Sequence, residues 1–147
     1  MILRSTRLPM IVALWVLVGC TGRTAEQQTP LPSSTRCRAL AVAPSGFMVT
    51  EKVEERYPDH IGIRITFKDD HGRLLHSFTG VPGEYGEGLP VAGSAHLVSG
   101  EDVSLIGKDQ TWIIAWDTGG LCGAHALIGN GFTREGFIKV LKASGVI

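Results

Sequence analysis

The chain has no excess of charge of either sign and no apolar run long enough to cross a bilayer. Fourteen basic and fourteen acidic residues balance over 147 positions, which excludes a strongly basic protein that binds nucleic acid through charge. An apolar stretch covers residues 8–18, about eleven residues, whereas a membrane-spanning helix needs about 20. We therefore expect no nucleic-acid partner, and the short apolar stretch suits the core of an export signal.

The sequence also lacks the spacings that mark catalytic, metal and cofactor sites. None of the histidines stands at ligand spacing from another histidine or a cysteine, and there is no Cys-x-x-Cys, Gly-x-Ser-x-Gly or Gly-Lys-Ser/Thr. We therefore expect no catalytic residue, no metal and no cofactor, and we interpret the histidines as surface and turn residues. They are His60, His71, His76, His96 and His125.

The N-terminal segment is the most informative part of the chain. Arg4 and Arg7 precede the apolar stretch, which ends in Leu17-Val18-Gly19-Cys20. This arrangement resembles the signal of bacterial lipoproteins, with its lipobox before an invariant cysteine. The resemblance implies that residues 1–19 are a signal peptide and that Cys20 receives a diacylglyceryl group, usually together with an N-acyl chain. Two or more acyl chains give stable anchoring.

The resemblance also implies a location. We expect a protein of the bacterial cell envelope, lipid-anchored to the outer leaflet of the cell membrane, or to the outer membrane if the host has one. Thr21 follows the cysteine, so the aspartate that tends to retain lipoproteins at the inner membrane is absent. The alternative is an ordinary secretory signal with a cysteine near its cleavage site. Removing residues 1–19 leaves twelve basic residues against fourteen acidic ones.

Two cysteines, Cys37 and Cys122, remain once Cys20 is lipidated. Outside the cytosol an even number of cysteines favours pairing, and only one intramolecular pair is available. We predict a Cys37–Cys122 disulfide. It would close a loop of about 85 residues and contribute at most about 4.6 kcal/mol in the chain-entropy model. The alternative is two separate buried thiols.

The mature chain divides into a tether and one small domain. Residues 20–36 carry the lipidated N-terminus and a polar stretch with two prolines, which predicts a flexible tether. Residues 37–147 predict a single α+β domain. The expected strands, of which 60–68 alternates most clearly, cover 46–53, 60–68, 73–79, 95–99, 103–107, 111–117 and 122–129. Residues 80–93 contain so many glycines and prolines that a long loop is predicted.

One amphipathic helix closes the chain. Thr133 is the expected N-cap, Phe132 and Phe137 have the spacing of a hydrophobic staple, and Gly145 ends the helix. The fold class is therefore α+β, with a curved antiparallel sheet of about five to seven strands covered by one C-terminal helix. The closing pattern of Trp-x-x-x-Trp, Cys-Gly, Gly-Asn-Gly and a capped helix resembles small bacterial envelope lipoproteins with curved sheets. We transfer no site residue from that resemblance.

Trp112 and Trp116 are the candidate ligand-binding residues. Their even spacing places both on one face of the same predicted strand. If that face lies in the core, they anchor the fold. If it is open, they form an apolar platform for a ligand, with Tyr85 from the long loop as a lid and His125 as a polar contact.

These features favour a lipid-anchored envelope protein that is a non-enzymatic binding or interaction module at the membrane surface. Its expected partners are the membrane, through the lipid anchor, and a protein partner or an apolar ligand. One alternative is an envelope hydrolase that uses a carboxylate or histidine, such as Glu84, Glu87 or His125. The other is an accessory subunit of an envelope complex, with the 80–93 loop as the contact.

Overall fold

The computed structural model describes residues 35–38 and 43–147. The predicted signal peptide, the lipidation site Cys20 and residues 21–34 of the tether lie outside these residues. Thr35 and Arg36, which the sequence assigned to the tether, already form a short strand. This short strand pairs with residues 60 and 61, so the start of the described chain already contributes to the sheet.

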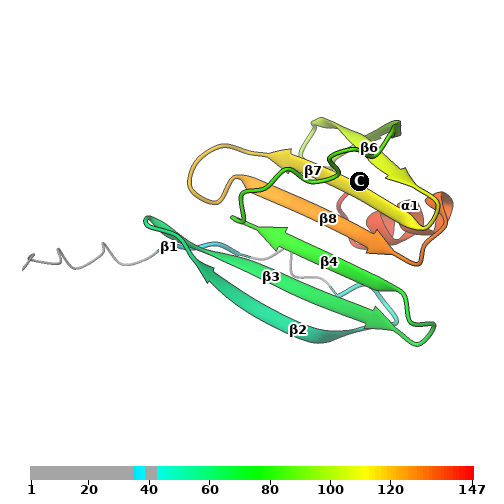
Figure 1. The fold of residues 1–147 in the computed structure, drawn as a ribbon, viewed down its shortest axis with the longest axis horizontal. Helices are drawn as coiled ribbons and strands as arrows, with labels where there is room; N and C mark the ends of the chain where they lie inside the picture. The colour runs from blue at the N-terminus through cyan, green and yellow to red at the C-terminus, as the bar shows by residue number, and fades with distance from the viewer. Residues whose placement is uncertain (1–34, 39–42) are drawn as a thin grey trace, which may run out of the picture.

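The described residues form one sheet and one helix (Figure 1). Eight strands follow the order β1-β3-β4-β8-β7-β6-β5, and β2 pairs with the free side of β3. The elements are β1 (Thr35–Arg36), β2 (Phe47–Arg56), β3 (His60–Asp69), β4 (Leu74–Thr79), β5 (Val91–His96), β6 (Asp102–Lys108), β7 (Thr111–Asp117), β8 (Ala124–Asn130) and α1 (Arg134–Ala143).

The α+β class is confirmed, but the sheet has more strands than expected. All pairs are antiparallel except β1 with β3, which run parallel. The additional strand, β1, has only two residues, too few for an alternating pattern. β5 begins at Val91, inside the stretch predicted as loop, and ends at His96 because Leu97 turns back to bond the Glu101 carbonyl at 2.8 Å.

The last strand in the chain, β8, lies in the middle of the sheet. It pairs with β4 on one side and β7 on the other, both antiparallel. The earlier part of the chain supplies β1 to β4, and the later part supplies β5 to β7. β8 therefore joins two separately connected groups of strands into one sheet.

The alternating pattern of β3 positions the core as predicted. Ile63, Ile65 and Phe67 are all buried in the main hydrophobic cluster, on the face that α1 covers. The opposite, more polar face of β3 is also partly enclosed. Thr66 and His60 are each 7% exposed, because Thr66 bonds side chains on both neighbouring strands and His60 is enclosed at the end of β3. The interpretation of His60 as a surface histidine was therefore wrong.

The C-terminal helix has the predicted cap and staple. The Thr133 side chain accepts a hydrogen bond from the Gly136 N–H at 3.1 Å, which satisfies one of the free donors of the first turn. Phe132 and Phe137 meet edge to face at 6.0 Å between ring centroids, and both are fully buried. A Cβ at Gly129 of β8 would lie 2.5 Å from the Phe137 ring. Only glycine there lets the helix lie this close to the sheet.

The long loop, residues 80–90, covers the other face of the sheet. Figure 1 shows it crossing in front of β8 and β7 towards β5, on the side away from α1. The Tyr85 ring packs against Phe78 of β4 at 5.2 Å between centroids. Gly86 lies against Ile106 and Ile113, where a Cβ would be 2.9 Å from the Ile106 side chain. The loop therefore acts as a second, irregular layer that buries the outer face of β7 and β8.

The β3–β4 turn is organised around one buried carboxylate. Asp69 accepts hydrogen bonds from the backbone N–H groups of His71 and Arg73, at 3.0 and 2.8 Å, and from Arg73 Nε at 2.6 Å. Burial alone would raise the pKa of Asp69, but the hydrogen bonds and the charge of Arg73 outweigh it, and this pKa lies below its ordinary value. The Arg73 guanidinium also lies over the Phe132 ring at 5.0 Å, which connects the turn to the core.

The Cys37–Cys122 disulfide is present, as predicted. Cys37 is 1% exposed and Cys122 is half-buried. The bond ties the chain that follows β1 to the loop that precedes β8, across a sequence separation of 85 residues.

We predict that Asp69→Ala lowers the free energy of unfolding by roughly 2–3 kcal/mol, because three donors lose a buried charged acceptor. Folding lowers the pKa of Asp69. The stability that the ionised carboxylate contributes is therefore present at pH values above its ordinary pKa, and it is lost as the pH falls through the pKa of the folded state. Urea denaturation across the acid range measures both effects. Asp70→Asn is the matched control, since the Asp70 side chain is 82% exposed. Equal losses in the two variants would contradict the assignment.

We predict that reducing the disulfide lowers the free energy of unfolding by about 2–4 kcal/mol, because the unfolded chain then gains the freedom of a long open loop. Denaturation with and without a reductant measures the loss. A double variant, Cys37→Ser with Cys122→Ser, should show the lower stability in both conditions. Two free thiols in the purified, unreduced protein would refute the bridge.

Candidate ligand-binding groove

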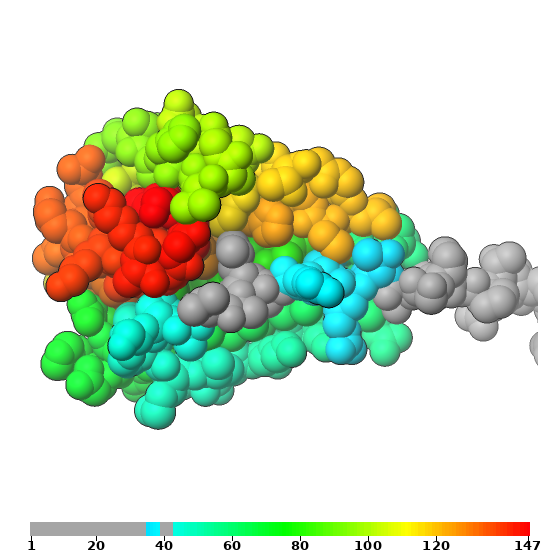
Figure 2. Space-filling view, turned by 180° about the vertical axis from the view of Figure 1, so that it is seen from behind, coloured from blue at the N-terminus to red at the C-terminus, as the bar shows by residue number. Residues whose placement is uncertain are grey.

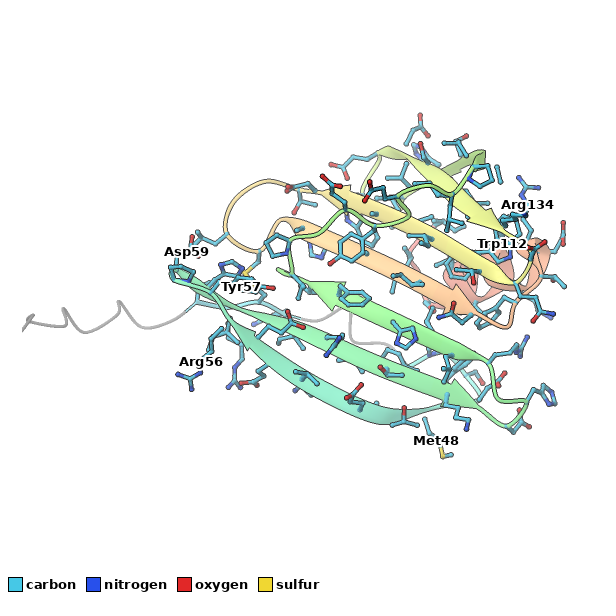
Figure 3. All side chains as sticks on the ribbon, in the orientation of Figure 1. Met48, Arg56, Tyr57, Asp59, Trp112 and Arg134 are labelled. Carbon is cyan, nitrogen blue, oxygen red and sulfur yellow. A yellow bond between two sulfur atoms is a disulfide. The ribbon has the colours of Figure 1, made fainter. Side chains whose placement is uncertain are left out.

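Trp112 and Trp116 share a face of β7 but occupy different environments. Trp112 is 7% exposed, lies on the part of β7 that α1 covers, and donates from Nε1 to the Phe132 carbonyl at 3.0 Å (Figure 3). Trp116 is half-buried near the other end of the strand and packs only against the margin of the core. The core interpretation therefore holds for Trp112, whereas Trp116 has a surface open to a ligand.

Trp116 forms a stacked pair with His125. The two residues are direct partners in the β7–β8 register, and their rings stack at 5.2 Å between centroids with planes 23° apart. Neighbouring strands therefore hold both rings in place before any ligand binds. The pair combines a large apolar surface with ring nitrogens that can hydrogen-bond.

The electrostatics of His125 favour a neutral ring. Burial lowers the pKa of His125, and the charges of Asp117 and Glu101 oppose this only in part. Its Nδ1 is buried and has no hydrogen-bond partner within residues 35–38 and 43–147. A buried polar atom without a partner is costly.

Trp116 and His125 line a first hollow, which we call the C-terminal groove. Its volume is about 200 Å³, and its walls come from the β5–β6 turn, the ends of β7 and β8, and the residues after α1. The Val98 N–H donates to the Val146 carbonyl at 2.9 Å, which fixes these segments against each other. Figure 2 shows the last residues, in red, beside this turn, in green. The lining residues are Leu97, Val98, Ser99, Trp116, Thr118, His125, Gly145 and Val146.

The same pair lines a second hollow, the Tyr85 groove, of about 300 Å³. Gly83 and Tyr85 of the long loop form one wall, and Ala115, Asp117 and Ala124 complete it. Burial, with smaller contributions from Tyr57 and Glu55, raises the pKa of Tyr85 to about 12. Its hydroxyl keeps its proton and donates to the Val81 carbonyl at 2.5 Å. Tyr85 is thus a fixed wall of this groove in the structure.

A third, more open hollow of about 400 Å³ lies beside Trp116 over β6 and β7. Glu101 and Asp102 give it an acidic rim. Trp116 therefore lines all three hollows, and His125 lines two of them. Trp116 and His125 are neighbours on the face of the sheet that Trp112 shares, whereas Tyr85 packs against Phe78 on the face away from α1. Trp112 lies in the core.

A polar network on the outer face of β2, β3 and β4 was not anticipated from the sequence. The Thr66 hydroxyl lies 3.3 Å from Glu51 Oε2 and 3.0 Å from His76 Nδ1. Burial and the nearby Arg64 lower the pKa of His76, although Glu51 raises it. The network depends on which residues lie opposite each other in the sheet, so only a correct register would have shown it.

Glu84 and Glu87, the carboxylates proposed for a hydrolase, are both exposed. Within the described ranges, no three His, Cys, Asp or Glu side chains gather closely enough to hold a metal ion. In the same part of the chain, no helix has the length and apolar character needed to span a bilayer.

Comparison with protein-family models, with curated proteins and with solved structures returns no match. The function must therefore be argued from the residues of this chain and their geometry.

Proposed function

We propose that the protein is a lipid-anchored, non-enzymatic binding module of the bacterial envelope, and that its ligand contacts Trp116 and His125. The lipobox-like segment before Cys20 supports the anchor, and the paired cysteines agree with an oxidising location. The observation that carries the binding role is the preformed Trp116–His125 stack beside the C-terminal groove.

The dimensions of the grooves limit the ligand. Sites for whole cofactors or drug-sized molecules usually have volumes of about 300–1,000 Å³ and enclose most of the ligand. The C-terminal groove, at about 200 Å³, is smaller and open. It fits one apolar side chain of a partner protein, or the end of an apolar chain, placed against Trp116. Val98, which is 72% exposed beside the groove, extends that apolar surface.

The two alternative functions stay predictions. An accessory subunit of an envelope complex would use the same surface, with a permanent partner in place of a transient one. A hydrolase would need a base and a bound substrate. His125 is the best-placed candidate base because its ring is favoured in the neutral form beside a groove.

We predict that radiolabelled fatty acid is incorporated into the protein in cells and that Cys20→Ala abolishes the labelling, because the cysteine sulfur is the only attachment point of the diacylglyceryl group. Cys37→Ser with Cys122→Ser is the control and should remain labelled. Labelling that survives Cys20→Ala would end the anchoring proposal.

We predict that a photoreactive side chain at Val98 cross-links in cells to one partner, because Val98 borders the C-terminal groove. Position 49 is the matched control, since Val49 is 55% exposed on the distant strand β2. The adduct from position 98 should disappear when Trp116 is changed to Ala. The same adducts from both positions, or none from position 98, would count against this surface.

A further inference from the structure

The chain enters the domain at β1, where β1 and β4 meet along the same edge of β3. β2 occupies the other edge as far as Ile61. β4 pairs with β3 from Ile63 onward, and β1 pairs with residues 60 and 61, so β1 and the end of β4 approach each other at Gly62. The Cys37 N–H then donates to the Ile61 carbonyl at 3.0 Å.

Glycines make this meeting possible. A Cβ at Gly62 would lie 2.5 Å from the Gly80 carbonyl oxygen. A Cβ at Gly80 would touch the Cys37 sulfur and lie 3.4 Å from the His60 ring. His60 and the disulfide are therefore packed around the same glycine. The Gly80 N–H donates to the Ala124 carbonyl at 2.7 Å, which adds the start of β8 to the junction.

His60 bonds an acceptor through each ring nitrogen. Nδ1 lies 2.7 Å from Asp59 Oδ1, and Nε2 lies 2.7 Å from the Gly80 carbonyl oxygen. A carbonyl oxygen and an ionised carboxylate both accept hydrogen bonds and donate none. The Asp59 side chain is 57% exposed, so its ionised form is hydrated. Both ring nitrogens must then carry protons, which makes His60 an imidazolium although its side chain is only 8% exposed.

We propose that Asp59, His60 and the Gly80 carbonyl form a proton-operated latch. A proton on His60 holds the end of β4 and the entering chain onto β3, and loss of that proton loosens the junction. A neutral ring has one N–H, so it would turn a lone pair either towards the Asp59 carboxylate or towards the Gly80 carbonyl at the present distances. One of the two bonds must therefore open.

The charged groups around His60 agree with this assignment. On the β2–β3 turn, the Tyr57 ring stacks on His60 at 4.7 Å between centroids, and its hydroxyl donates to Glu55. Figure 3 shows Tyr57 and Asp59 together at this end of the sheet. On β1, Arg36 pairs with Glu54 of β2 at 3.0 Å. The disulfide does not titrate, and the residues next to Gly80 carry no charge. Among residues 35–38 and 43–147, Asp59 is the one charged group bonded to the ring.

The direction of the pH dependence follows from the same contacts. The hydrogen bond to Asp59 raises the pKa of His60, burial opposes it, and the Gly80 carbonyl raises it further. Because the pKa of His60 is higher in the folded protein, the stability that protonated His60 contributes is complete at pH values below the ordinary histidine pKa of about 6.5. This stability is lost as the pH rises through the pKa of His60 in the folded state. Asp59 behaves oppositely. The bond to His60 lowers the pKa of Asp59, so its contribution is lost only in acid. The latch is therefore closed between the two titrations and opens on the alkaline side.

The latch matters most where the tether begins. If Cys20 carries lipid, a point that rests on the proposed function, then the chain entering at Thr35 leads directly to the membrane. Protonation of His60 would then control how firmly the domain holds the start of its own tether. The experiment below needs no membrane, so failure of the anchor would leave the latch testable.

The test uses purified protein with ring-nitrogen NMR and amide hydrogen exchange from about pH 6 to pH 9, a range that starts below the ordinary histidine pKa. Both His60 nitrogens should be protonated at neutral pH, and the ring should titrate above the ordinary value. Exchange protection at the Cys37 and Gly80 amides should fall as His60 loses its proton. Protection at the Phe137 amide, within α1, should not follow that titration.

The deciding variant is Asp59→Asn. An asparagine amide donates to Nδ1, so a neutral ring satisfies both bonds and the alkaline loss of protection at Cys37 and Gly80 should disappear. Asp102→Asn is the matched control, because Asp102 bonds His96 at 2.9 Å in an exposed pair, and the loss should persist there. If Asp59→Asn does not fold, His60→Gln replaces it, since it keeps a donor for Gly80 without a titrating group. A neutral His60 at pH 7, or an undiminished alkaline loss in Asp59→Asn or in its replacement, would overturn the latch.

Discussion

The Cys37–Cys122 bond is the interaction on which the arrangement of this domain depends. β1 contributes two residues to the sheet, and so short a strand cannot hold itself in place. The bond fixes the chain after β1 against the loop before β8, which is the strand that joins the two parts of the sheet. A small domain with one short helix has limited apolar surface to bury, so a covalent connection between its first and last strands has a large effect.

Residues 35–38 and 43–147 contain a single helix, and the burial of the two faces of the sheet follows from that. α1 covers the face that carries Ile65, Trp112 and Ile114, and these side chains form the main core. On the other face the 80–90 loop packs over the middle of the sheet. There, the surface of β2 and β3 is completed by polar side chains that bond one another. Gly86 serves that packing, because its backbone lies directly on Ile106 and Ile113.

Local patterns predicted the elements well and the environment of single residues less well. The alternation in β3, the run that became β7 and the capped helix were all visible, because each is set by neighbours in sequence. β1 and the early start of β5 were not, since both form only through pairing with distant strands. The spacing of Trp112 and Trp116 placed both on one face, but it could not show that Trp112 is buried while Trp116 stays half-buried. The bonds around His60 come from Gly80, twenty residues away, and only the tertiary structure brings that carbonyl into place.

The central position of β8 has a consequence for how the chain acquires its structure. Residues 74–79 and 111–117 both pair with β8, which follows them in the sequence. Until it arrives, two incomplete sheets each present an unpaired edge, and contacts between such distant segments form slowly. The sheet is therefore completed only when β8 has paired with both of its neighbours.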